Sequence, residues 1–414
     1  MKNSRFYRWI SLLMIVLVFF SLGIFIISKD RARSSREQRN LVTLFDIELS
    51  GILTGEFENE LYEYANDQFT LRNRLMDLRN GISVAMGEKE KNGIYRADDG
   101  YLIEGFKVPD MDNFEEQAAA VNLFAKNNSK LNCYVFIVPT ASATLDLKLP
   151  DGAPLGDEKA YFKNWKDSLD SGITFIDVRN AFKNHAGEEL FYKTDSRWTS
   201  LGAYYAYKEA AAPMQLNIAN DRFEAMTVAN DYVGPLCYES GYYDYSSDSI
   251  SIYFNQDNAF VQVVEYPETG EKSVSMYKSE KLEGIEKLDV FFGGAHGQVN
   301  IETSSASDRN LLVIKDSNGD SFVPYLVNNF RRIVMIDPEL YEGDINSLIR
   351  KEDFSDVLFL YQSGNISEDK ALVKMLNGEN VTEEGLESAL PEFTKDDTAN
   401  VKTPVGGGGN ALLF

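Results

Sequence analysis

Histidine, cysteine and positive charge are scarce in this chain of 414 residues. Its 41 Lys and Arg face 64 Asp and Glu, a formal net charge of −23, which disfavours nucleic acid as a partner because phosphates would be repelled. The two cysteines, Cys133 and Cys237, cannot form a disulfide framework, and the sequence leaves a single bridge between them open. The two histidines, His185 and His296, are far apart. No spacing typical of metal ligands occurs, so the sequence predicts neither a metal nor another cofactor.

An uncharged run of 18 residues extends from Ile10 to Ile27, after Lys2, Arg5 and Arg8. This is long enough to span a bilayer and longer than the usual core of a signal peptide. No clear small-x-small cleavage motif follows it. We therefore expect an uncleaved single-span membrane anchor, with a cleaved signal peptide as the alternative. Long domains cross membranes largely regardless of flanking charge, so we expect most of the chain to be extracytoplasmic.

Short apolar strands alternate with helical patterns through much of the chain. Cys133–Val138 is fully apolar, and a helical pattern over 157–170 separates it from the next strand, Ile173–Val178. This alternation is typical of an α/β fold with a parallel sheet flanked by helices. The same patterns predict a broken helix over 57–85, a hairpin over 92–103, a helix capped by Asn113, a helix capped by Thr199 or Ser200, and strands at 288–293, 311–315, 332–336 and 356–361.

Changes in these patterns divide the chain into six expected segments. Residues 215–287 show little helical spacing of apolar residues and many stretches in which polar and apolar residues alternate, which indicates a β-rich insertion within the α/β domain. The run of glycines near the C-terminus indicates a flexible tail. The segments are a cytoplasmic stub and anchor (1–30), a juxtamembrane helical segment and hairpin (31–110), the first part of the α/β domain (111–214), the β-rich insertion (215–287), the second part of the domain (288–375) and an acidic C-terminal tail (376–414).

Ser317 is a candidate nucleophile because of the pattern around it. The apolar run from Leu311 ends in Lys315, Asp316 and Ser317, and a helical pattern follows from Phe322. A strand, a tight polar turn and a helix N-terminus present a hydroxyl where backbone amides and the helix dipole can stabilise an oxyanion. Serine also needs a base, which in turn needs an orienting acid. Asp and Ser are ordinary turn residues too, so the pattern alone leaves a structural role open.

A second motif, Asp195-Ser196-Arg197-Trp198, resembles the Asp-His-His-Trp signature of the DHHW family. The resemblance covers roughly residues 37–362. DHHW proteins are similar to SGNH-hydrolase-like proteins that O-acetylate exported polysaccharides, which implies an SGNH-like α/β fold and acyl-transfer chemistry. By resemblance, Ser317 takes the position of the nucleophile, Asp195 that of the acid and Arg197 that of the base. Further blocks in the family's order are Glu37–Leu41, Gly55–Phe57, Asp67–Arg72, Asn92–Tyr95, Tyr101–Glu104, Gly293-Gly294 and Ile314–Ser317.

Arg197 decides whether such a site is active, because an arginine stays protonated and cannot accept a proton from serine. One interpretation is an inactive site, since loss of the histidine from a subtilisin triad costs about 10⁶ in turnover. Another is a substitute base, for which His296 in the glycine-rich stretch Gly293–Gly297 is the candidate; an ordinary loop histidine is the alternative. A third is that Arg197 pairs with Asp195 or holds an anionic ligand.

Two hypotheses of function follow for a membrane-anchored extracytoplasmic protein. The first is a degenerate relative of polysaccharide O-acetyltransferases that binds a cell-surface polysaccharide or a partner in an envelope assembly. The second is an active serine O-acyltransferase or esterase that transfers acetyl groups to surface glycan through Ser317. Because Arg197 stands at the position of the base, we favour the first hypothesis, with the second as the alternative.

Overall fold

The computed structural model describes most of the chain beyond the N-terminal segment. The expected span Ile10–Ile27 and the expected tail 376–414 lie mostly outside the described residues. Among the helices that are described, none is at once long and apolar enough to cross a membrane. The described residues are 7–9, 11–13, 15–16, 20, 28–34, 39–44, 56–69, 71–219, 221–242, 246–255 and 261–379.

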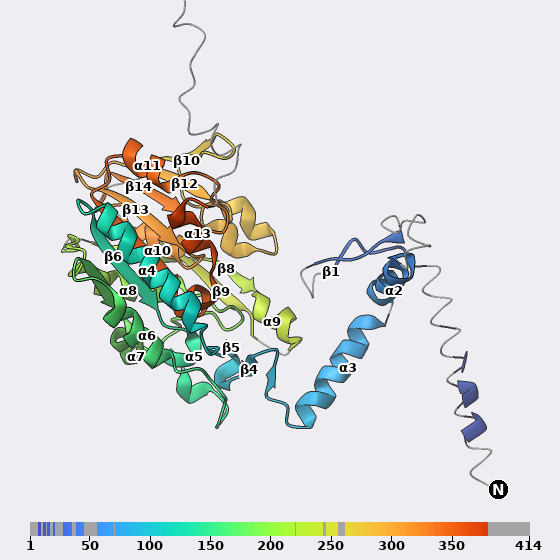
Figure 1. Ribbon diagram of the computed structural model, residues 1–414. Coiled ribbons are helices and arrows are strands. Elements are labelled where there is room, and N and C mark those ends of the chain that lie inside the picture. Colours follow the sequence, from blue (N-terminus) through green and yellow to red (C-terminus); the bar gives the residue numbers. More distant parts are fainter. Residues whose placement is uncertain are drawn as a thin grey trace, which may run out of the picture.

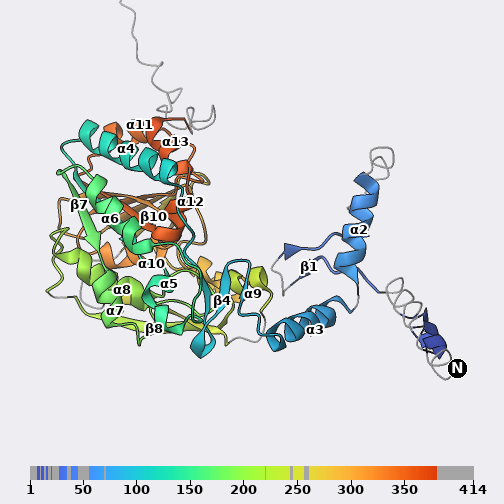
Figure 2. The ribbon, with the colours of Figure 1, turned by 60° about the horizontal axis from the view of Figure 1, so that its bottom comes forward.

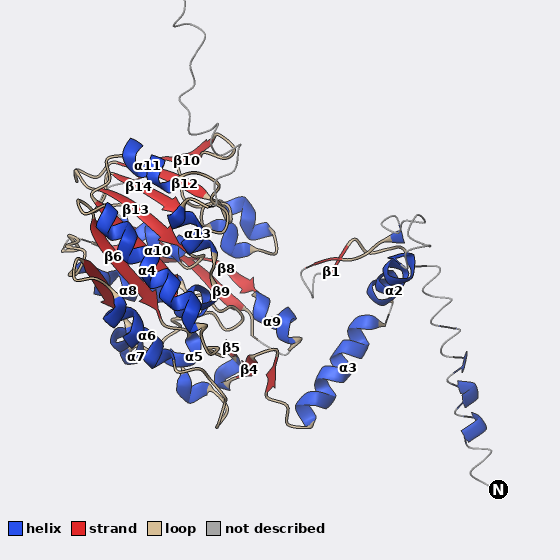
Figure 3. Cartoon of the chain, in the orientation of Figure 1, coloured by secondary structure: helices blue, strands red, loops and turns tan. Residues whose placement is uncertain are grey.

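A mixed eight-stranded sheet forms the centre of the molecule (Figure 1), and its strands cross the body in Figure 3. The strand order is β11-β10-β12-β14-β13-β15-β6-β7. The five strands from β14 to β7 are parallel, as the sequence predicted, whereas β12, β10 and β11 add an antiparallel edge that it did not. The strands are β6 (Asn132–Val138), β7 (Ile173–Asp177), β10 (Val261–Tyr266), β11 (Glu271–Ser273), β12 (Gln298–Thr303), β13 (Asn310–Lys315), β14 (Arg332–Ile336) and β15 (Asp356–Gln362).

The central strands are apolar between their end residues because both faces of the sheet are covered. Every residue of β13 and of β15 is buried. Successive side chains of β13 enter opposite cores: Leu311 and Val313 pack in one cluster, Leu312 and Ile314 in the other. The sheet therefore lies between two layers.

Helices supply most of both layers (Figure 2). Thr199 caps α8 as expected, since its hydroxyl accepts a hydrogen bond from the Gly202 N–H. The cap of α4 is Asp110 and not the expected Asn113, because the Asp110 carboxylate accepts the N–H groups of the first turn. On one face lie α4 (Met111–Asn127), α6 (Glu158–Ser168), α11 (Ile345–Lys351), α12 (Ser363–Glu368) and α13 (Ala371–Asn377); the other core includes α5 (Ala141–Thr144), α7 (Arg179–Asn184), α8 (Ser200–Ala211) and α10 (Gly319–Phe322).

The stretch expected to be a β-rich insertion contributes to two sheets. β8 (Phe223–Tyr232) and β9 (Asp248–Asn255) pair with each other, and α9 (Pro235–Ser240) lies between them in sequence. β10 and β11, from the same stretch, join the main sheet. The prediction of a strand at 288–293 is wrong. Its apolar residues are buried in a 3-10 turn (Lys287–Val290) and a single bridge from Phe291 to Tyr277.

An N-terminal arm precedes the body. The expected broken helix is confirmed as α2 (Glu56–Gln68) and α3 (Arg72–Ala85). Figure 1 shows these helices standing away from the sheet and its layers. The expected hairpin is confirmed within a small three-stranded sheet that joins the arm to the body. Its strands are β3 (Glu90–Lys91), β4 (Ile94–Arg96) and β5 (Leu102–Glu104), and the arm also carries the pair β1 (Arg33–Ser34) and β2 (Arg39–Asn40).

Candidate functional site at the carboxyl ends of the central strands

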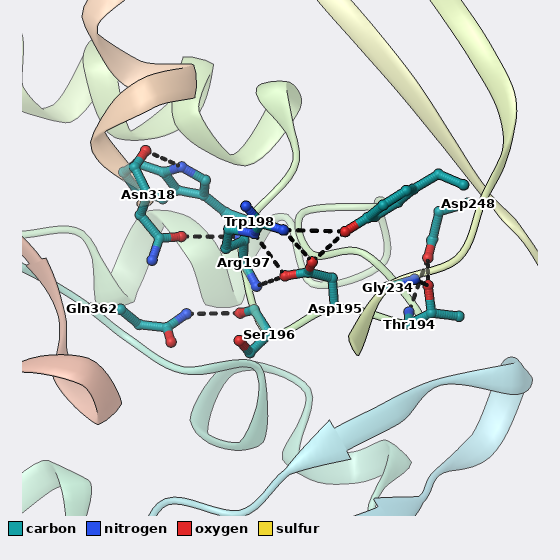
Figure 4. A network of polar contacts seen from close by, with 10 residues as sticks. Thr194, Asp195, Ser196, Arg197, Trp198, Gly234, Asp248, Asn318 and Gln362 are labelled. Atoms are coloured by element: carbon teal, nitrogen blue, oxygen red, sulfur yellow. Dashed lines mark hydrogen bonds and ion pairs between the residues drawn. The ribbon is translucent and has the colours of Figure 1, made fainter. Parts of the chain in front are cut away.

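The DHHW-like motif and the Ser317 turn lie side by side at the carboxyl ends of the parallel strands (Figure 4). The backbone N–H of Trp198 donates to Asn318 Oδ1 at 3.2 Å, and its indole N–H donates to the Asn318 carbonyl at 2.9 Å. Gln362, the last residue of β15, donates to the Ser196 carbonyl at 2.9 Å. Two segments about 120 residues apart in sequence thus meet at one edge of the sheet.

Asp195 and Arg197 form a bidentate ion pair inside this edge. Arg197 Nε and Nη2 lie 2.9 and 2.6 Å from the two carboxylate oxygens, and the Arg197 backbone N–H donates at 2.9 Å. The Tyr232 hydroxyl also donates to the carboxylate, at 2.5 Å. Asp195 is only 1% exposed, while the Arg197 side chain is 24% exposed. The carboxylate oxygens that would orient a histidine therefore hold the guanidinium.

The protonation states of this pair are fixed by its geometry. Burial raises the pKa of Asp195, but the charge and hydrogen bonds of Arg197 and Tyr232 outweigh it, so the pKa falls below its usual value. Burial lowers the pKa of Arg197, yet the adjacent carboxylate raises it further still. The pair is ionised at any working pH, and Arg197 offers no atom that can accept a proton.

A second carboxylate, Asp248 at the start of β9, holds the motif from the other side. It accepts the N–H groups of Lys193 and Thr194 at 2.7 and 2.9 Å and the Thr194 hydroxyl at 2.5 Å. That hydroxyl in turn accepts the Gly234 N–H at 2.8 Å. Only glycine fits at 234, because a Cβ there would lie 2.4 Å from the Thr194 carbonyl oxygen and 2.7 Å from Asp195 Cβ. The motif is thus packed between β9 and the chain before α9.

Ser317 is exposed at the tip of the turn after β13, and no described residue hydrogen bonds to its hydroxyl. Its neighbour Asp316 is buried and accepts the backbone N–H of Gln362 and of Asn318, each at 2.8 Å, and Asn365 Nδ2 at 2.7 Å. Asp316 therefore serves to fix the turn. The exposed hydroxyl is the part of the turn that remains accessible to a ligand.

Lys315 lies beneath this turn and is 3% exposed. Its ammonium pairs with Asp320 at 2.8 Å and with Asp337 at 3.8 Å. Burial lowers the pKa of Lys315, but these carboxylates raise it above its usual value, so the lysine stays charged. A Cβ at Gly319 would come within 2.8 Å of Lys315 Cβ, so the turn closes over the side chain. Lys315 therefore provides no free base at this turn.

The two histidines have partners away from Ser317. The ring nitrogens of His296 face the Phe292 carbonyl, 3.2 Å from Nε2, and Glu268, 3.6 Å from Nδ1. His185 Nδ1 lies 2.6 Å from a Glu188 oxygen. In the described part of the chain, neither ring contacts Ser317, Asp195 or Arg197. The structure thus brings the segments of Ser317, Asp195 and Arg197 together at the carboxyl ends of the parallel strands. His296 makes its contacts elsewhere.

A small, partly open pocket lies beside the motif. Ser196 and Gln362 belong to its wall, together with Glu104, Lys107 and Glu368. Lys107 and Glu368 form an ion pair at 2.7 Å, and burial raises the pKa of Glu104 although Lys107 opposes the shift. These groups can donate hydrogen bonds to a polar ligand and accept them from it. No cluster of three or more metal-binding side chains occurs among the residues searched, those that the structure describes.

Sequence reasoning missed Tyr232, Asp248 and Asn318. The first two come from β8 and β9, which return to the motif from a stretch without any recognisable pattern of site residues. Asn318 could have been predicted as a site residue, because it follows Ser317 directly. An asparagine side chain in a turn commonly forms hydrogen bonds with nearby backbone groups.

Comparison with known proteins agrees with this architecture. Residues 96–239 match the family described as SGNH hydrolase-like domain, acetyltransferase AlgX; this span includes Asp195 and ends before Ser317. A DHHW family protein from Eubacterium siraeum has a similar structure, with a TM-score of 0.60 at 21% identity over 71% of this chain and 98% of that one. PatB1 from Bacillus cereus, in a structure with a sulfonyl adduct, has a TM-score of 0.56 at 19% identity over 68% of this chain and 97% of that one. No curated protein matches.

These comparisons confirm the resemblance that the motifs indicated. Residues 96–239 match an SGNH hydrolase-like domain, and the chain shares its fold with a DHHW family protein.

Proposed function

We propose that this chain is a catalytically inactive SGNH-like protein that acts in the acetylation of cell-envelope or exported polysaccharide, outside the membrane to which its N-terminal segment anchors it. The match to an acetyltransferase domain supports the acetylation-related role. The observation that carries the inactive assignment is the bidentate pair between Asp195 and Arg197 at the position of the base.

The chemistry of acyl transfer explains this assignment. Ser317 Oγ would attack the acyl carbonyl of a donor and form an acyl-serine, while the donor's leaving group departs with a proton. A sugar hydroxyl would then attack the acyl-serine, take the acyl group and release the Ser317 hydroxyl. Each attack releases a proton that a neighbouring base must accept. Arg197 is already protonated, its partner Asp195 is held ionised by four hydrogen bonds, and Lys315 is charged. Binding of polysaccharide in the polar cavity requires none of these proton transfers.

An acyl-ester assay tests the proposal. Purified protein is incubated with p-nitrophenyl acetate as wild type, Ser317→Ala and Arg197→His. We expect wild type and Ser317→Ala to release nitrophenol at the same background rate. Arg197→His should gain turnover that disappears again in the double variant with Ser317→Ala. Wild-type turnover that Ser317→Ala abolishes would refute the inactive assignment.

The binding role has its own test in the cavity wall. Affinity for soluble fragments of envelope polysaccharide is measured for wild type and for Ser196→Trp, which fills the cavity beside Gln362. Leu147→Trp is the control, because Leu147 is exposed and is not among the residues that line the cavity. Binding lost only in Ser196→Trp supports the proposal, and equal binding by all three proteins contradicts it.

An active serine acyltransferase or esterase is the second candidate. The observation that favours it is the exposed Ser317 hydroxyl on a turn that Asp316 fixes. This candidate needs a base other than Arg197, and His296 stays the prediction from the sequence. It requires His296→Ala to abolish turnover as completely as Ser317→Ala does, with His185→Ala as the control.

A further inference from the structure

The wall of the pocket beside the motif contains an unsatisfied hydrogen-bond acceptor. Gln362 is 3% exposed, and its amide nitrogen donates to the Ser196 carbonyl (Figure 4), so its Oε1 is directed away from that carbonyl. No group in the described part of the chain donates to this oxygen, which lies 3.8 Å from the position that a Cβ at Gly364 would take. Gly364 and Gln362 both line the pocket, so the Oε1 of a buried side chain is free to accept a hydrogen bond from a ligand there.

Two further acceptors belong to the same wall. The Ser196 hydroxyl and the Glu104 carboxylate line the pocket, and neither has a hydrogen-bond or ion-pair partner within the described ranges. Glu104 is half-buried. Burial raises the pKa of Glu104, and although Lys107 opposes the shift, nearby carboxylates add to it. A partly desolvated carboxylate without a partner gains most from a ligand that brings both a hydrogen-bond donor and a positive charge.

The charge of the pocket is negative. Lys107 is the one basic side chain among the described residues that line it, and its ammonium already pairs with Glu368 at 2.7 Å. The charge of Glu104 is therefore left without a paired cation, and Glu239 lies close enough to raise the Glu104 pKa further. A uronate or a phosphate would be repelled at this place.

An ammonium group matches these acceptors in number and in charge. It has three N–H donors, one positive charge and no acceptor, whereas a hydroxyl or an acetylated amine has one donor and no charge. The pocket is small and suits one substituent better than a whole sugar ring. We propose that it binds the protonated amine of an amino sugar, whose three N–H groups donate to Glu104, to Gln362 Oε1 and to the Ser196 hydroxyl. The inference rests on the proposed function, because it names the sugar that the bound polysaccharide presents.

Three oligosaccharides with the same backbone test this assignment on the full-length protein in detergent. They are oligomers of glucosamine, of N-acetylglucosamine and of N,N,N-trimethylglucosamine. The second lacks the charge, and the third keeps the charge but has no N–H donor. We expect calorimetry to show that the glucosamine oligomer binds at least about tenfold more tightly than either of the others, because hydrogen bonds between charged groups are among the strongest. Equal binding of the glucosamine and trimethylated oligomers overturns the proposal, since the net charge of −23 would then attract any cation.

A matched pair of variants identifies the carboxylate responsible. Glu104→Gln keeps the shape of the side chain and removes its charge. Glu209→Gln removes the same charge from an exposed position on α8 that does not line the pocket. We expect the preference for the glucosamine oligomer over the N-acetylglucosamine oligomer to fall at least about tenfold in Glu104→Gln and to stay unchanged in Glu209→Gln. An unchanged preference in Glu104→Gln, or an equal fall in both variants, overturns the proposal.

These results separate failure of this inference from failure of the proposed function. If wild type binds none of the three oligomers, or binds them equally, while Ser196→Trp still abolishes binding of envelope polysaccharide, only the assignment of the amine is wrong. If Ser196→Trp changes nothing either, both proposals fail. The comparison of the three oligomers uses wild type alone, so it decides the matter even if Glu104→Gln does not fold.

Discussion

At the scale of single residues, the chain contains the same ion pair in two environments. Asp177 and Arg179 have the spacing of Asp195 and Arg197, and their guanidinium nitrogens lie at the same 2.9 and 2.6 Å from the carboxylate oxygens. Both side chains of the first pair are about one-third exposed, at 34 and 31%. The Asp195 side chain is 1% exposed. Identical geometry therefore has different consequences, because water can replace a lost partner only at Asp177.

Replacement of each arginine by alanine measures this difference. Arg197→Ala leaves the Asp195 carboxylate buried with only Tyr232 and one backbone N–H, and we expect a loss of roughly 2–4 kcal/mol in free energy of unfolding. Arg179→Ala should cost about 1 kcal/mol or less. Urea denaturation of both variants checks the prediction. Similar losses for the two variants would show that the site around Asp195 is open to water.

Asp248 makes stability depend on pH. Burial raises its pKa to about 6, although the hydrogen bonds from Thr194 and Lys193 oppose the shift. Because the folded value lies above the ordinary value of 3.8, the stability contributed by this group is present below pH 3.8 and is lost as the pH rises through about 6. From pH 4 to 7, Asp248→Asn should therefore gain roughly 2–3 kcal/mol relative to wild type.

Urea midpoints of wild type and Asp248→Asn at several pH values measure this gain. Other titrating groups, such as Asp337, whose pKa burial also raises to about 6, affect both proteins equally and cancel in the difference. Parallel curves for the two proteins would mean that Asp248 titrates normally and that water reaches its carboxylate.

At the scale of elements, the site depends on how closely the chain before α9 approaches the motif. Gly234→Ala would place a Cβ 2.4 Å from the Thr194 carbonyl oxygen, so the two segments must separate. We expect a loss of about 1–3 kcal/mol in free energy of unfolding. Gly172→Ala is the matched control, because nothing lies within 4 Å of its Cβ, and it should change stability by no more than about 0.5 kcal/mol. Equal effects in thermal unfolding would contradict the packing described.

The elements that the sequence predicted correctly are those whose burial leaves a pattern. β13, β14 and β15 were predicted because strands covered on both faces have continuous apolar runs between their end residues. The 288–293 stretch is also rich in apolar residues, but these fill a core from a 3-10 turn and the residues after it, and apolar residues alone do not distinguish a turn from a strand. β12 alternates and carries Gln298 and Asn300 at the antiparallel edge, so it gave no strong signal.

The meeting of the motif with the Ser317 turn was also predictable, since strand ends of a parallel sheet share one edge. Its means were not. Asn318 bonds to the Trp198 main chain, and Tyr232 bonds to Asp195, through contacts between residues 120 and 37 positions apart. Such contacts depend on how the loops return to the sheet, which local patterns do not encode.

At the scale of the whole molecule, the chain separates into a body that holds the sheet and an arm that buries little. Both large cores are built from residues after Lys91, beginning with Tyr101 and Ile103 in one and Phe106 in the other. α3 contributes no buried residue. β5, in contrast, is tied to the motif, because the Leu102 N–H donates to the Lys193 carbonyl at 2.7 Å. The residues that the body needs in order to fold should therefore begin between α3 and the small three-stranded sheet.

Two N-terminal deletions locate this boundary. A fragment of residues 89–379 keeps both cores, so its free energy of unfolding should lie within about 1 kcal/mol of the full chain. A fragment of residues 107–379 loses the buried side chains of Tyr101, Leu102 and Ile103, and large-to-small changes at single buried positions already cost about 2–5 kcal/mol, so it should be severely destabilised or unfolded. Urea denaturation followed by circular dichroism measures both. Loss of folding in 89–379 would mean that the arm, although exposed in a single chain, is needed to hold the body together.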